Sequence, residues 1–65
     1  MQITVILRKE AIILNGNYAT VFDLFKELNL ASEAYLILQE GQMIDSTAPL
    51  HDGDVIKLVP VLSGG

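Results

Sequence analysis

Two glycines, Gly64 and Gly65, carry the group in this sequence with the clearest capacity for chemistry. They follow the apolar stretch VIKLVPVL and one serine, and they present an α-carboxylate. Such a carboxylate has a pKa of about 3.5, so at neutral pH it is ionised and can attack an electrophile such as ATP. Glycine has no Cβ, so the pair is slim enough to enter a narrow tunnel in another protein. At a glycine usage of about 7%, two terminal glycines arise by chance in roughly half a per cent of chains. We therefore expect the Gly65 carboxylate to be the working group.

The other candidates for catalysis are weaker. Residues 51–54 (HDGD) are the one stretch that brings histidine and carboxylates together, but Asp-Gly is ordinary turn chemistry. Ser32, Ser46 and Ser63 could act as nucleophiles only beside a base and an orienting acid, which a single histidine makes improbable. With no cysteine and one histidine, the chain has a poor inventory of metal ligands. We expect no intrinsic catalytic residue, no metal and no bound cofactor.

Composition limits the kinds of partner. The chain has 65 residues and a net charge of -4, which argues against nucleic acid and anionic membranes and favours a basic protein surface. No apolar run approaches a membrane span, and the N-terminal residues lack the features of a signal peptide, so we expect a cytoplasmic protein. A hydrophobic fraction of 51% is high for one small domain. The surplus indicates an apolar surface that binds a partner.

Apolar and β-branched runs predict five strands that would position the terminal glycines. They are Gln2–Leu7, residues 11–14, Tyr35–Gln39, Gln42–Ile44 and residues 55–62. The first two form a hairpin with a polar turn. Pro60 in the last strand marks an edge or the end of pairing, because proline has no N–H to donate.

One amphipathic helix is expected between the second and third strands. Its apolar residues are Val21, Leu24, Phe25 and Leu28. Thr20 and Asp23 form a capping box at its start, and Asn29 is a plausible terminator. Because one amphipathic helix covers only one side of a sheet, we predict an α+β fold. It consists of a mixed sheet of four to five strands with one helix packed across one face.

Side-chain alternation predicts which residues lie on the uncovered face of this sheet. Ile56 and Leu58 alternate with Lys57, so they should face the helix. The residues expected on the uncovered face are Ile6, Ile37, Val55, Val59 and Val61. They would form an apolar stripe that runs toward the glycines.

Over essentially its whole length the chain resembles the small ubiquitin-like sulfur carriers, typified by the thiamin carrier ThiS and the molybdopterin carrier MoaD. The resemblance rests on the hairpin opening, the Thr-capped helix TVFDLFKEL, the Asp-Gly-Asp turn and the ending VPVLSGG. It implies a single β-grasp (ubiquitin-like) domain over residues 1–62, followed by a flexible Gly-Gly tail at residues 63–65.

The resemblance implies a protein cosubstrate rather than an enzyme. A ubiquitin-activating-type enzyme would adenylate the carboxylate of Gly65, using its own bound ATP and magnesium. A sulfur donor, commonly a persulfide on another protein, would convert the adenylate to a thiocarboxylate, and a downstream synthase would take the sulfur. Gly64 would let the tail extend, and Ser63 would lie in the arm. The residues expected to bind the partner are Ile6, Ile37, Val59, Val61 and Leu62.

The sequence does not determine which pathway receives the sulfur. The compact length resembles the thiamin carrier, whereas a proline shortly before the tail resembles the molybdopterin carrier. A carrier for tRNA thiolation and a ubiquitin-like modifier that forms an isopeptide bond with lysine would have the same tail. A plain interaction module with unused glycines is a further alternative.

Overall fold

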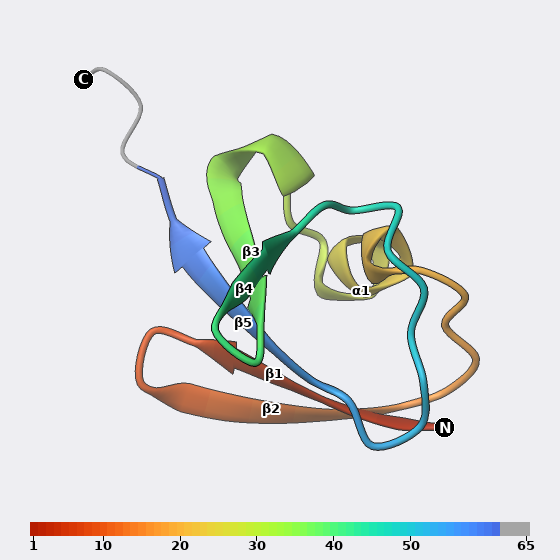
Figure 1. Cartoon of the computed structure of the whole chain (residues 1–65). Coiled ribbons are helices and arrows are strands. Elements are labelled where there is room, and N and C mark those ends of the chain that lie inside the picture. The colour runs from red at the N-terminus through yellow and green to blue at the C-terminus, as the bar shows by residue number, and fades with distance from the viewer. Residues whose placement is uncertain (62–65) are drawn as a thin grey trace.

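The computed structural model describes residues 1–61, which form five strands, one α-helix and one short 3-10 helix (Figure 1). The strands are β1 (Gln2–Leu7), β2 (Glu10–Asn15), β3 (Tyr35–Gln39), β4 (Gln42–Ile44) and β5 (Val55–Pro60), and the helices are α1 (Val21–Leu28) and η1 (Ser32–Ala34). The sheet order is β2-β1-β5-β3-β4. β1 and β5 are parallel, and the other neighbours are antiparallel. The predicted mixed sheet with a single helix is confirmed.

The strand boundaries follow the predictions closely. β3 and β4 span the predicted residues, and β2 is one residue longer at each end than residues 11–14. The prediction for Pro60 is confirmed, because it is the last residue of β5 and is paired with Tyr35. The predicted strand at residues 55–62 is too long, since Val61 is not part of β5.

Helix α1 begins and ends at the capping residues that the sequence predicted, Thr20 and Asn29. The carboxylate of Asp23 accepts hydrogen bonds from the backbone N–H groups of Ala19 at 2.8 Å and Thr20 at 3.3 Å. Asn29 ends the helix with φ 57°, the left-handed conformation that asparagine tolerates better than most residues. These contacts satisfy backbone groups that a helix end leaves without intrahelical partners.

The connection between β4 and β5 also supports α1. The N–H of Val21 donates to the carbonyl of Ala48 at 3.1 Å, and the N–H of Phe22 donates to that of Ser46 at 2.9 Å. The start of the helix is therefore fixed against a segment that is distant in sequence.

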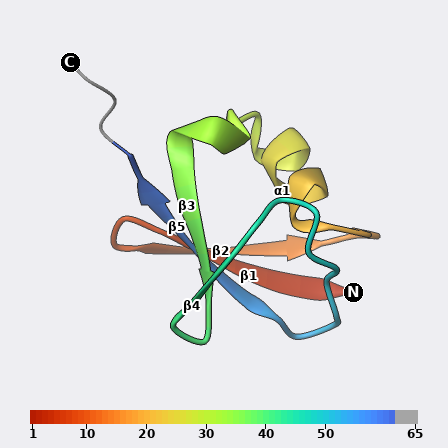
Figure 2. The same ribbon diagram turned by 45° about the horizontal axis from the view of Figure 1, so that its top comes forward.

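The hydrophobic core lies between α1 and one face of the sheet (Figure 2). Its buried residues are Ile3, Val5, Tyr18, Val21, Leu24, Phe25, Ile37, Leu50, Ile56 and Leu58. Ile56 and Leu58 face the helix as predicted, and they are 0% and 2% exposed. Because α1 covers only this side, the sheet has a second face that no described helix covers.

Candidate functional site

The face of the sheet opposite α1 is the open face. Strand register and side-chain alternation place residues from all five strands on it: Thr4, Ile6, Ala11, Ile13, Leu36, Leu38, Met43, Val55, Lys57 and Val59. Several of its apolar side chains are substantially exposed, Leu36 at 42%, Ile13 and Val55 at 51% and Met43 at 68%. Much of the exposed apolar surface thus lies on one side of the sheet, while Phe22 on α1 is also 46% exposed. A contiguous apolar patch of this kind is typical of a partner-binding surface.

Two of the residues predicted to bind a partner lie on the face where the sequence placed them, and a third is exposed just beyond β5. Ile6 and Val59 are half-buried on the open face. Val61 follows β5 and is 44% exposed. Its N–H donates to the carbonyl of Ala34 at 2.9 Å, which holds the backbone beside η1 one residue beyond the strand. The end of β5 therefore carries exposed apolar side chains up to the last described residue.

The prediction that Ile37 lies on the uncovered face is wrong. Ile37 is 6% exposed and is paired with Leu58 on the side of the sheet that α1 covers. Its neighbours Leu36 and Leu38 occupy the open face instead. The segment YLILQ is apolar at four successive positions, so a period of two does not fix which alternate set points to the core.

Leu62, Ser63, Gly64 and Gly65 lie outside the described residues. Their predicted roles in docking and activation therefore stay predictions. The described part of the chain shows the surface from which they continue.

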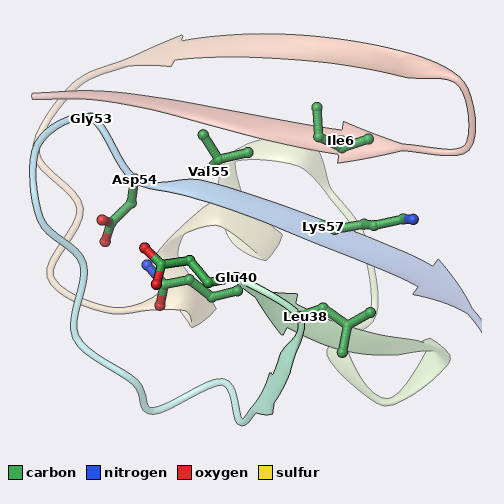
Figure 3. Close-up of a pocket in the computed structure, with 9 residues that line it drawn as sticks. Ile6, Leu38, Glu40, Gly53, Asp54, Val55 and Lys57 are labelled. Carbon is green, nitrogen blue, oxygen red and sulfur yellow. The ribbon is translucent and has the colours of Figure 1, made fainter.

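A groove of about 530 Å³ runs across the open face between β1, β5 and the β3–β4 turn (Figure 3). It is lined by Ile6, Leu38, Gln39, Glu40, Gly41, Gly53, Asp54, Val55 and Lys57. Sequence reasoning missed this groove, because it depends on β1 and β3 lying on either side of β5. The parallel pairing of β1 with β5 joins segments that are far apart in sequence.

The HDGD segment is a turn, as the sequence indicated. The N–H of His51 donates to the carboxylate of Asp54 at 2.8 Å, and the N–H of Asp54 donates to the carbonyl of His51 at 3.0 Å. The carboxylate of Asp52 accepts from the N–H of Gln2 at 2.7 Å, which fastens the turn to β1. Among residues 1–61, no three His, Asp or Glu side chains are grouped to hold a metal ion.

The groups with shifted pKa values have structural roles. Hydrogen bonds from the N–H groups of Ala19 and Thr20 lower the pKa of Asp23, and Lys26 adds to the effect. Hydrogen bonds from the side chain and the N–H of Thr47 lower the pKa of Asp45. These carboxylates cap α1 and close a turn, and neither belongs to the open face.

The architecture defines the class of protein: a five-stranded mixed sheet with one helix across one face is the β-grasp fold. A chain in the solved complex of subunits 1 and 2 of molybdopterin-converting factor from Helicobacter pylori 26695 has the same fold. The two chains superpose with a TM-score of 0.71 and 26% sequence identity over 100% of each. No curated protein matches this chain.

The chain belongs to the ThiS family, whose profile matches residues 2–65. Members of this family are sulfur carrier proteins and not enzymes, so the resemblance and the carrier role predicted from the sequence are confirmed. Within residues 1–61, no helix is long and apolar enough to cross a membrane.

Proposed function

We propose that this sulfur carrier is activated at the carboxylate of Gly65 by a ubiquitin-activating-type enzyme. The observation that carries the proposal is the family match, which extends through Gly64 and Gly65. The exposed apolar residues at the end of β5 support it, since the chain continues from there to the two glycines. The carrier is a cosubstrate in this scheme, and the enzyme binds ATP and magnesium.

The chemistry begins with attack of a Gly65 carboxylate oxygen on the α-phosphorus of ATP. Pyrophosphate leaves, and an acyl adenylate forms. The terminal sulfur of a persulfide on a donor protein then attacks the acyl carbon, and AMP leaves. A thiol cleaves the resulting S–S bond, which leaves a thiocarboxylate on Gly65 and a disulfide. A downstream synthase takes the sulfur, and the carboxylate is regenerated.

Docking on the activating enzyme is assigned to the open face and to the residues that follow it. The predicted residues Ile6, Val59, Val61 and Leu62 keep this role. Leu36 and Leu38 replace Ile37, because only they are presented to a partner. Apolar contact over this face would hold the carrier while the glycines reach the adenylation site, where their lack of side chains suits a narrow passage.

Two acceptors for the sulfur are proposed, the thiazole of thiamin and molybdopterin. Membership of the ThiS family supports the first. The similarity to a chain from a molybdopterin-converting factor supports the second. Either reaction would take place in the cytoplasm.

The decisive experiment is an intact-mass measurement after incubation with ATP, magnesium, a persulfide donor and a candidate activating enzyme. The full chain should gain the mass expected for replacement of one oxygen by sulfur, and a chain that lacks Gly65 should not. An unchanged mass together with no carrier-dependent exchange between ATP and pyrophosphate would contradict the proposal.

A reconstitution distinguishes the acceptors. The thiocarboxylate form would be offered separately to a thiazole synthase system and to a molybdopterin synthase catalytic subunit. Consumption of the thiocarboxylate in one system alone would assign the pathway.

A further inference from the structure

Lys57 is the one cationic side chain on the open face of the described chain. Its Cα is paired with Ile6 of β1 on one side and Leu38 of β3 on the other, so aliphatic side chains flank it. Within residues 1–61 it takes part in no ion pair. Figure 3 shows its side chain extending along β5 toward the end of that strand. A partner that docks near the end of β5 therefore covers this ammonium group.

The groove on the open face has opposite charges at its two ends. The carboxylates of Glu40 and Asp54 lie near the start of β5, and the ammonium of Lys57 points the other way (Figure 3). Val55 and Leu38 are apolar members of the same lining. The open face is thus an apolar surface that carries negative charge near the start of β5 and positive charge toward its end.

Covering Lys57 with a purely apolar surface would be unfavourable. An ammonium group that loses water needs a hydrogen-bonding anion in exchange, because burial of an unpaired charge costs far more than the gain from apolar contact. The long alkyl stem of lysine can still lie against Ile6 and Leu38 while its head meets that anion. A single carboxylate on the partner is the simplest group that satisfies both requirements.

We propose that the activating partner covers the open face with an apolar surface carrying one carboxylate that pairs with Lys57, and a basic side chain that faces Glu40 and Asp54. The inference rests on the proposed function, since it describes the partner that activates Gly65. The two charged contacts would determine the orientation in which the partner docks as well as its affinity. A partner turned end to end would bring like charges together.

A second copy of this chain fits the open face less well. The five strands contain three to six residues each. At about 4.8 Å between strands and about 3.3 Å per residue they give a face of roughly 400 Å². A stable interface buries about 800 Å² on each partner. Each copy also has a net charge of -4, so two copies repel each other. A partner with basic residues around its carboxylate avoids this repulsion, and the terminal residues that enter its adenylation site add contact area beyond the open face.

Charge-reversed and charge-conserving variants of Lys57 test the inference. The rate of exchange between ATP and pyrophosphate would be measured against carrier concentration for the full chain, Lys57→Glu, Lys57→Met and Lys57→Arg, using the activating enzyme that adenylates the wild-type carrier. Lys26→Glu is the charge-reversal control on α1, on the other side of the sheet. Lys26 is 64% exposed and its Nζ lies 3.2 Å from the carboxylate of Asp23, so the stability of this variant is checked before its KM is compared. The melting temperature of each variant would be measured first.

The expected result is an increase of about tenfold or more in KM for Lys57→Glu, with kcat changed less than about twofold. Lys57→Met should raise KM by a smaller factor, and Lys57→Arg and Lys26→Glu should leave it near the wild-type value. Added salt should narrow the difference between wild type and Lys57→Glu.

Two outcomes would overturn the inference in different ways. Equal KM values for wild type and Lys57→Glu, or a lower KM for Lys57→Met, would show that the partner brings no carboxylate to Lys57, and the proposed function would stand. If no candidate activating enzyme supports exchange with the wild-type carrier, the proposed function is contradicted, and the inference, which rests on it, is contradicted as well.

Discussion

Leu36 of β3 lies directly opposite Val59 of β5 on the open face of the sheet. One position further along β3, Ile37 lies opposite Leu58 on the face that α1 covers. Adjacent residues of one strand thus serve different purposes, Ile37 in the core and Leu36 in the surface assigned to a partner.

Substitution of these two neighbours should separate activation from stability. Leu36→Glu should leave the free energy of unfolding nearly unchanged, because Leu36 is 42% exposed, and should raise the carrier KM in ATP–pyrophosphate exchange. Ile37→Ala should lower the free energy of unfolding by about 2–4 kcal/mol through loss of buried methyl groups. Urea denaturation and exchange kinetics measure the two effects. A large loss of stability in Leu36→Glu with unchanged KM would contradict the assignment of the two faces.

The tail can be tested without disturbing the sheet. Gly64→Val adds a branched side chain where a narrow passage is proposed, so it should abolish adenylation while leaving the thermal transition at the wild-type temperature. Ser63→Ala is the matched control and should be adenylated normally. Adenylate formation would be followed by pyrophosphate release. Normal adenylation of Gly64→Val would show that the passage is wider than proposed.

Much of the fold could be predicted because its signals are local. Thr20, Asp23 and Asn29 mark the ends of the helix, and the turn residues mark β3 and β4. The position of Ile37 could not be predicted in this way. In most sheets the exposed alternate set is polar, but here Leu36 and Leu38 are apolar, as expected for the surface that we propose binds a partner. The apolar character of both alternate sets therefore removed the signal for the orientation of β3.

The candidate site was predictable only in part for a related reason. The alternation of Ile56, Lys57 and Leu58 places Val59 on the correct face, since a charged residue fixes the phase. The groove depends on which strands flank β5, and hence on pairing between residues such as Ile6 and Lys57. Hydrophobic periodicity contains no information about that pairing.

The Asp23 carboxylate that caps α1 should make the stability of the fold depend on pH. The lowered pKa of Asp23 means that folding favours its ionised form. Its contribution is therefore complete above the ordinary aspartate pKa of 3.8 and is lost as the pH falls through the lower pKa of the folded state. Asp23→Asn should melt at a lower temperature than wild type at pH 7, and the difference should shrink below pH 3.8.

The exposed Glu10→Gln variant is the control for loss of one carboxylate. It should melt close to wild type at pH 7. A difference between Asp23→Asn and wild type that stayed constant down to the acid transition would argue against the charge as the source of the effect.

The turn before β5 depends on the backbone of Gly53. Gly53 has φ 89°, and a Cβ placed there would meet no atom within 4 Å. Gly53→Ala should therefore cost about 1–2 kcal/mol of unfolding free energy through backbone strain alone. Because the chain is short enough for chemical synthesis, D-alanine can replace Gly53 as the control. The D residue favours positive φ and should not be destabilising, whereas equal losses for both forms of alanine would point to a steric cause.

The central position of β5 also governs how the chain folds. β5 joins β1 to β3, so without it the sheet separates into the β1–β2 and β3–β4 hairpins. Small isolated hairpins are at best marginally stable in water. Pairing of β1 with β5 closes a loop that includes every other helix and strand of the described chain, and such non-local contacts slow folding. A fragment cut before β5 should not present a partial docking face, and enzymes that use this carrier should meet either a complete surface or an unfolded chain.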